Sequence, residues 1–231
     1  IKSLARLCNQ GIILELNSPE AVTWVKNPFN KLIFIEKLGG HVNIKERLFN
    51  IVVPFLPIST DILDPTIIWH IEQENDIAEA AITQAKWIKD PSKHSRKQWV
   101  AHTLLTLSSP EAANKLLKNG LYINMERLWP HKDKKEPIRC LKCQCLGHLA
   151  RDCLQEVDTC SACAGEHRIT QCTSPDIVFC INCQSSTHTS TDRFCPQLIK
   201  RCNIMDERTP ENNMPYFLTE EPWTQVLAPP K

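Results

Sequence analysis

The chain has 231 residues, which is room for about one or two domains of roughly 100 to 200 residues each. Its formal net charge is only +1, so a nucleic-acid partner has to be recognised from local clusters of charge rather than from the total. No run of about 18 or more apolar residues occurs, and we therefore expect neither a membrane-spanning helix nor a membrane partner.

The first 46 residues show the signals of a strand, a helix and a second strand. Residues 11–17 form an apolar run, and Ser18-Pro19-Glu20-Ala21 follows as a helix start, with serine as the cap and proline in the first turn. After Gly39-Gly40, residues 42–44 are predicted to form a short strand.

The same order recurs between residues 102 and 125. Residues 102–108 are predicted as a strand, and Ser109-Pro110-Glu111-Ala112 repeats the helix start. Gly120 marks the helix end because glycine commonly follows the last helical turn. With a short strand predicted over residues 121–125, the chain contains an internal repeat of strand, helix and strand.

Three more elements precede the second copy. Residues 48–54 are predicted as a strand, residues 64–74 as a helix and residues 82–88 as another strand. The order βαββαβ over residues 47–130 is the ferredoxin-like plan of RNA-recognition-motif (RRM-like) domains. The predicted fold class is therefore α+β, with a truncated, partial RRM-like unit over residues 1–46. The alternative is an unrelated α+β domain with two chance Ser-Pro-Glu-Ala helix starts.

A charged linker is predicted over residues 131–139, ahead of the cysteine-rich region. Residues 196–231 are predicted to form an extended tail, because prolines interrupt long helices and recur here at Pro210, Pro215, Pro222, Pro229 and Pro230.

Eleven of the twelve cysteines lie between Cys140 and Cys202, and only Cys8 precedes them. Disulfides stabilise many small secreted domains, but disulfide formation gives no reason to place a histidine before the last cysteine of each group. His148, His167 and His188 have that position. We therefore predict metal sites, and with them a reducing, intracellular location in the cytoplasm or the nucleus.

The spacing predicts three consecutive Cys-Cys-His-Cys knuckles, over residues 140–153, 160–172 and 180–195, each holding one Zn²⁺ ion. Their ligands are Cys140, Cys143, His148 and Cys153; Cys160, Cys163, His167 and Cys172; and Cys180, Cys183, His188 and Cys195. The second and third spacings are irregular, so an exchange of His167 with a neighbour, or of Cys195 with Cys202, stays open. Cys8, Cys145 and Cys202 are predicted as free thiols.

A metal held by four protein ligands has no open position for a substrate, so we expect neither catalysis nor a small-molecule substrate. His70-Ile71-Glu72 matches half of a zinc-deaminase signature, but no cysteine pair is preceded by proline as the other half requires. A cross-braced ubiquitin-ligase finger would interleave its ligand pairs, whereas here each pair is followed directly by its own histidine and cysteine.

The first knuckle, Cys140-Leu-Lys-Cys-Gln-Cys-Leu-Gly-His-Leu-Ala-Arg-Asp-Cys153, is similar to Gag zinc knuckles. With the unequal spacing of the three knuckles and a tail that contains Met214-Pro-Tyr-Phe217 and Glu221-Pro-Trp223, the chain resembles the Gag-like first-open-reading-frame proteins of fungal non-LTR retrotransposons. The resemblance implies a protein that coats its element's RNA, self-associates into ribonucleoprotein particles and acts as a nucleic-acid chaperone, without polymerising or cutting.

Single-stranded RNA or DNA is the expected partner of the first knuckle. Leu141 and Leu149 are placed to form an apolar platform for an unpaired base. The cations expected to meet phosphates are Lys132, Lys134, Lys135, Arg139, Lys142 and Arg151. The alternative is a solvated run of charge. From residue 153 to residue 192 five carboxylates face one cation, Arg168, so protein contacts are as plausible there as RNA binding.

The domain before the knuckles lacks the aromatic-rich strand of RNA-binding RRM domains, since residues 98–105 match it poorly. The preceding loop carries Lys93, Arg96 and Lys97, which are candidates for phosphate contact, beside Lys86 and Lys89. Self-association is the competing role of this domain. Outside the retrotransposon family, the alternatives are a cellular zinc-knuckle factor of RNA processing and a protein-interaction scaffold.

Overall fold

The structure is a computed structural model that describes residues 1–6, 11–39, 42–174 and 176–226. The chain divides into two compact units, Ile1–Arg47 and Leu48–Lys231. The predictions on Cys8, Pro229 and Pro230 lie outside the described residues. Over the described ranges, the helices are all too short or too polar to cross a membrane.

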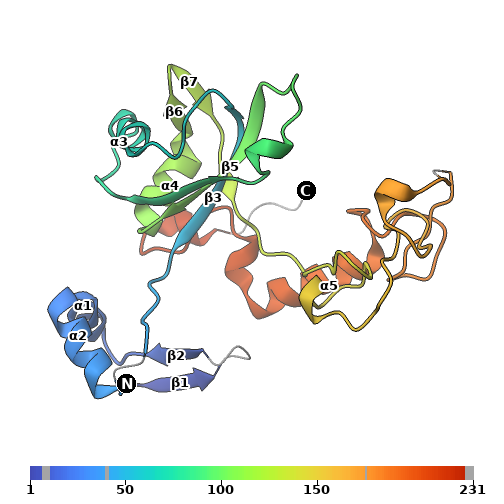
Figure 1. The fold of residues 1–231 in the computed structure, drawn as a ribbon. Helices are drawn as coiled ribbons and strands as arrows, with labels where there is room; N and C mark the ends of the chain where they lie inside the picture. Colours follow the sequence, from blue (N-terminus) through green and yellow to red (C-terminus); the bar gives the residue numbers. More distant parts are fainter. Residues whose placement is uncertain (7–10, 40–41, 175, 227–231) are drawn as a thin grey trace. The chain divides into compact units, whose positions relative to one another are not determined.

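The first unit contains a β-hairpin and two helices (Figure 1). Strands β1 (Ser3–Arg6) and β2 (Ile12–Glu15) pair antiparallel, and helices α1 (Pro19–Lys26) and α2 (Pro28–Lys37) follow. Ser18 caps α1 as predicted, its side chain accepting from the Ala21 N–H. None of the residues of this unit whose side chains are described is buried. The unit therefore has no apolar core of its own in the described part.

The predicted strand over residues 42–44 is wrong, because the structure has no regular element there. Among the described residues of this unit, the only ladder joins β1 to β2, so residues 42–44 have no strand beside them to pair with. The helical segment is also divided in two at Asn27, whose side chain accepts hydrogen bonds from the N–H groups of Phe29 and Asn30. Proline at residue 28 lacks the N–H that would continue α1.

The second unit contains a four-stranded antiparallel sheet with the order β4-β5-β3-β8. Its strands are β3 (Phe49–Pro57), β4 (Ile82–Trp87), β5 (Val100–Leu107) and β8 (His131–Lys132). Helix α3 (Pro65–Glu74) follows β3, and α4 (Pro110–Asn119) follows β5. The strands and helices predicted over residues 48–119 are all present, and the α+β class is confirmed.

The end of the predicted βαββαβ order differs from the structure. Residues 121–125 do not join the main sheet, because β6 (Leu121–Ile123) pairs with β7 (Glu126–Leu128) in a hairpin of its own. Asn124 and Met125 both have positive φ, 50° and 63°, and two such residues form the tight turn that reverses a chain. The fourth strand of the sheet is β8, inside the predicted linker.

The core packs the inner face of this sheet against α3 and α4, with Ile51, Leu105, Leu107 and Leu116 almost fully buried. A buried carboxylate stabilises the connection between α3 and β4. The Glu72 carboxylate accepts from the backbone N–H groups of Ala80 and Ile82, at 3.0 and 2.7 Å. Glu72 therefore stabilises the turn into β4, which gives the His70-Ile71-Glu72 motif a structural role.

The predicted extended tail is wrong for its first third. Residues 196–208 form α5 (Pro196–Arg208), the longest helix of the described chain. Proline at its first turn is compatible with a helix, and the next proline, Pro210, comes only after α5 has ended. Three short 3₁₀ helices lie at Pro91–Lys93, Ala150–Asp152 and Ile169–Gln171, and two more, Pro210–Asn213 and Pro222–Gln225, follow α5.

Beyond α5 the chain returns to the sheet domain and packs on its core. The Phe217 ring meets Phe49 edge to face, with ring centroids 5.1 Å apart. The side chain of Asn114, which is 1% exposed, donates to the Phe217 carbonyl and accepts from the Phe217 N–H, at 2.7 and 2.8 Å. One asparagine of α4 thus anchors a segment that lies about 100 residues further along the chain.

We predict that Asn114→Ala lowers the free energy of unfolding by about 2 kcal/mol, because it leaves the Phe217 N–H and carbonyl without partners in a half-buried site. Urea unfolding measures the loss. Asn203→Ala, at an exposed position of α5, is the matched control and should leave the midpoint unchanged. Equal midpoints for both variants would contradict the anchoring role.

Candidate metal centres and the surfaces around them

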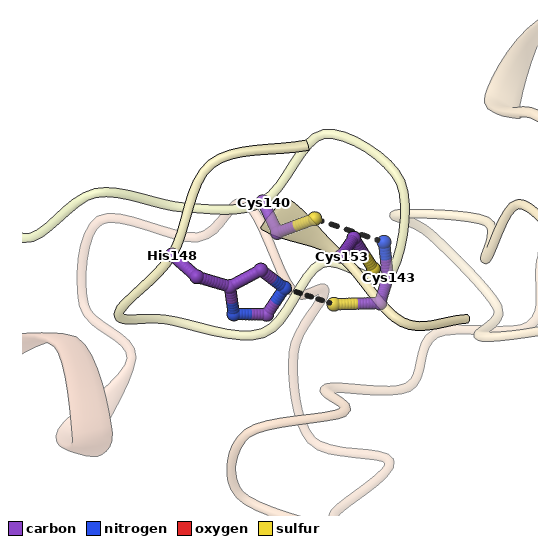
Figure 2. Close-up of side chains that lie close together, drawn as sticks. All are labelled: Cys140, Cys143, His148 and Cys153. Carbon is purple, nitrogen blue, oxygen red and sulfur yellow. Dashed lines mark hydrogen bonds between the residues drawn. The ribbon is translucent and has the colours of Figure 1, made fainter. Parts of the chain in front are cut away.

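The side chains of Cys140, Cys143, His148 and Cys153 point toward one another (Figure 2). Their ligand atoms all lie within 4.8 Å of one another, and the Cys143 Sγ is 3.4 Å from the His148 Nε2. The two cysteines of the pair come from a tight turn, His148 follows Gly147, and Cys153 caps the short helix Ala150–Asp152. This arrangement can hold one metal ion.

Two further clusters have the same composition. Cys160, Cys163, His167 and Cys172 form the second, where the Cys163 and Cys172 sulfurs are 3.8 Å apart. In the third, Cys180, Cys183, His188 and Cys195 converge, and the Cys195 sulfur lies 3.7 and 3.4 Å from the other two. The structure thus groups the twelve predicted ligands by their order in the chain, without an exchange of His167 and with Cys195 rather than Cys202.

The geometry of these clusters fits a tetrahedral metal ion. A zinc–sulfur bond of about 2.3 Å puts two sulfur ligands about 3.8 Å apart. The sulfur–sulfur separations of 3.4 to 3.8 Å in the second and third clusters agree with that spacing. In the described chain the His188 Nε2 is buried without a hydrogen-bond partner, while its Nδ1 lies 2.9 Å from the Thr187 hydroxyl. An imidazole nitrogen in this position is suited to bind a metal.

All three clusters are built on the same local turn. The residue after the second cysteine has a left-handed backbone in each, with φ of 61° at Gln144, 61° at Ala164 and 52° at Gln184. Its N–H donates to the carbonyl of the first cysteine, as from Gln144 to Cys140 at 2.9 Å. Gly147 has φ 118°, a backbone conformation that favours glycine before His148. The turn brings each cysteine pair to one point.

Backbone N–H groups point at the first sulfur of the turn. The N–H groups of Lys142 and Cys143 both lie 3.4 Å from the Cys140 sulfur. Burial alone raises the pKa of the Cys140 thiol, but these N–H groups and the neighbouring thiols outweigh burial and lower the pKa to about 7. The pKa of Cys160 is lowered to about 7 for the same reasons. The thiolate form is therefore favoured at the first cysteine of these two turns, and the thiolate is the form that binds a metal.

Hydrogen bonds connect the three clusters into one array, so they are not independent modules. The Asn182 side chain, from the turn of the third cluster, accepts from the Leu146 N–H at 3.0 Å and donates to the Gln144 carbonyl at 2.9 Å. Backbone hydrogen bonds of 2.7 Å run from Thr159 to Lys142 and from Phe179 to Ala162. Each cluster is therefore attached to both of the others.

Helix α5 packs on this array. Leu198 and Leu146 are both 6% exposed and form a small apolar cluster with Cys180 and Cys195. The Arg201 guanidinium donates to the Leu146 carbonyl at 2.9 Å. Sequence reasoning missed Asn182 and Arg201, because a polar residue inside a Cys-x-x-Cys turn or on a helix carries no local signal of a long-range partner. It also missed Leu146, because a single apolar residue in a cysteine-rich segment forms no periodic pattern.

Two of the lysines predicted to bind phosphate have partners in the tail. The Lys132 ammonium donates to the carbonyls of Glu211 and Tyr216 and lies 4.8 Å from the centre of the Phe217 ring. The Lys134 ammonium is 3.1 Å from the buried Asp206 carboxylate. Their predicted nucleic-acid contacts stay predictions, and the structure gives both lysines a role in holding the tail.

The other predicted contacts divide by exposure. Lys135 and Arg151 are exposed, and the Arg151 guanidinium is 3.6 Å from the Asp152 carboxylate. Arg139 and Lys142 are half-buried. Leu141 is 80% exposed and Leu149 39%, so both apolar side chains of the predicted platform reach solvent. The remaining predicted cations, Lys93, Arg96 and Lys97, are exposed in the loop between β4 and β5.

Cys145 and Cys202 lie outside the three clusters. The eleven cysteines in the described ranges are all free of disulfides, which agrees with the prediction of metal sites. Cys202 packs beside Leu198 in the small cluster under α5. Both thiols therefore act as ordinary half-buried side chains.

The chain matches part of a known protein. The chain is similar to the nucleic-acid-binding protein from mobile element jockey of Drosophila melanogaster, with 35% identity over 78 residues. The match covers 33% of this chain, and the chain spans only 13% of that protein. No family model and no solved structure matches the chain.

We predict that each chain binds three metal ions, and that a chelator unfolds residues 140–195 and detaches α5 while the sheet domain stays folded. The clusters have too little apolar core to hold their shape without metal, whereas the sheet domain has its own core. Metal analysis of the pure protein and hydrogen exchange with and without chelator measure both effects. One or two ions per chain would contradict the assignment of at least one cluster.

Proposed function

We propose that this protein binds single-stranded nucleic acid, RNA above all, through its metal-ordered knuckles, as a Gag-like packaging protein of a mobile element. The observation that carries the proposal is the set of three clusters of three cysteines and one histidine in a chain similar to a nucleic-acid-binding protein of a mobile element. Formation of ribonucleoprotein, self-association, chaperone activity and an intracellular location are parts of the same proposal.

We propose zinc as the metal. Three thiolates and one imidazole are the usual ligands of structural zinc, and the sulfur spacings suit its bond lengths. A four-coordinate ion has no open position to activate water, so its role is to hold the knuckles in shape. The protein is accordingly proposed to be a binding protein rather than an enzyme.

The sheet domain supports the RRM-like part of the proposal. Its strand order is β4-β5-β3-β8, which is the order of a ferredoxin-like sheet. Helix α3 connects β3 to β4, and α4 lies between β5 and β8, as that plan requires. The hairpin of β6 and β7 is then an insertion before the last strand. RNA-binding domains of this plan use the sheet face that the helices leave open.

Bases and phosphates have plausible contacts on the first knuckle. Leu141 is 80% exposed beside the metal-bound turn, and an unpaired base can lie on such an apolar side chain. Arg151 and Lys135 are exposed cations in the same part of the chain. Phosphate contact by these side chains would position the strand without reading its sequence.

A protein-interaction role is the second candidate for the later knuckles. Their cations are engaged, since Arg168 pairs with Asp158 and Arg193 with Glu136. Phe194 is 82% exposed beside the third cluster. An exposed aromatic ring among paired charges and carboxylates favours a protein partner over phosphate.

We expect Leu141→Ala to weaken the binding of an unstructured oligouridine about fivefold, because one apolar contact to a base is lost. Leu154→Ala is the matched control, since Leu154 is 98% exposed and lies between the first two clusters. Fluorescence anisotropy at low salt measures both affinities, and metal analysis verifies that both variants keep three ions. The platform is refuted if the two variants bind equally well.

A further inference from the structure

Phe55 has a backbone conformation that is sterically costly for a residue with a bulky side chain. Its φ is 57°, in the left-handed region, at a bulge of β3 where the pairing with β5 shifts between Val53 and Leu56. Glycine or asparagine adopts this conformation with less steric cost than a bulky residue. The ring is also 62% exposed, so it contributes little to the core. An aromatic side chain at this position therefore costs backbone strain and leaves its ring open to a partner.

The Phe55 ring lies against a second ring on the neighbouring strand. Its centroid is 5.5 Å from that of the exposed His102 on β5, with the planes at 55°. On the far side of β5, the Ile88 N–H donates to the His102 carbonyl at 2.9 Å, and Ile88 is 55% exposed. Three neighbouring segments thus place two rings and an apolar side chain at one end of the sheet.

A group of cations lies at the end of β4 and in the loop that begins there. Lys86, Lys89, Lys93, Arg96 and Lys97 are all exposed. As far as the chain is described, none of the five forms a salt bridge, although Lys93 attracts the Asp90 carboxylate. On the knuckles, by contrast, Arg151, Arg168 and Arg193 each have a carboxylate partner.

The loop itself is held in a defined shape. The Asp90 side chain accepts from the Ser92 N–H at 2.9 Å and caps the short helix Pro91–Lys93. The His94 Nε2 is 3.0 Å from the Lys89 carbonyl, and the His94 ring meets the Trp87 ring edge to face. An ordered loop presents its cations in fixed positions, which lowers the entropic cost of binding a charged partner.

We propose that this end of the sheet is a second binding surface for single-stranded nucleic acid, with a base on the Phe55–His102 pair and phosphates on Lys93, Arg96 and Lys97. The inference rests on the proposed nucleic-acid function and adds a site that contains no metal ligand. Exposed aromatic rings beside cations without carboxylate partners are the combination that binds single strands without sequence preference. An apolar protein partner would leave the charge of the loop without a counterpart.

The test compares Phe55→Gly, Phe55→Tyr and His148→Ala in the metal-loaded full chain, with an unstructured oligouridine about 20 nucleotides long as the probe. Phe55→Gly removes the ring and suits the backbone at φ 57°, so we expect about tenfold weaker binding without a lower Tm. Phe55→Tyr keeps a ring and should keep the affinity. A merely structural role would lower the Tm of one or both variants instead.

The cations are tested by the triple variant Lys93→Ala, Arg96→Ala and Lys97→Ala. Each lost phosphate contact lowers the slope of log K against log salt concentration by about 0.7. The magnitude of this slope should therefore fall by up to about 2 in the triple variant. The control variant removes the same charge from exposed positions of the first unit, by Lys26→Ala, Lys37→Ala and Lys45→Ala. It should change the slope less.

The outcomes separate this inference from the proposed function. If His148→Ala weakens binding while Phe55→Gly and the triple variant match the wild type, the second surface is overturned and the knuckle function stands. Undetectable binding of the wild-type chain would overturn the proposed function and, with it, this inference. If only the triple variant is weaker, the Phe55–His102 platform is overturned.

Discussion

The convergence of three thiols and one imidazole at three points determines the course of the chain from residue 140 to residue 195. Little apolar surface is buried there: apart from the cysteines, the small cluster of this region contains only Leu146 and Leu198. A metal ion in each cluster would supply the stability that a larger core supplies elsewhere. Asn182 and the backbone bonds between turns then join the clusters into one surface on which α5 can pack.

The position of α5 has consequences for distant residues. Because α5 packs on the cysteine–histidine clusters, the segment after it is directed back to the sheet domain, where Asn114 and Phe49 contact Phe217. Lys132 and Lys134 lie between the two regions in the sequence. Lys132 donates to the returning segment, and Lys134 pairs with Asp206 of α5. Lysines that the sequence offers for phosphate contact thus hold the tail instead. Among the described residues, few cations around the three clusters are left without a partner.

This distribution of charge bears on how the chain would bind nucleic acid. The clusters offer exposed apolar side chains such as Leu141, with most nearby cations paired. The sheet domain offers Phe55 and His102 beside a loop of exposed cations. Binding through both surfaces would share one strand between a metal-dependent site and a metal-independent one, which raises the effective concentration of each for the other.

The sequence by itself determined the features that have short-range causes. Ser109 and Pro110 begin α4, Gly120 ends it, and the cysteine spacing defines the ligand sets, since these interactions span few residues. Tertiary structure alone decided the rest. The two-residue strand β8 is too short to show a pattern, the α5 helix depends on packing that its flanking prolines conceal, and Lys132 meets a carbonyl 79 residues away. Contacts of that separation leave no local signal, because either partner alone resembles an ordinary surface residue.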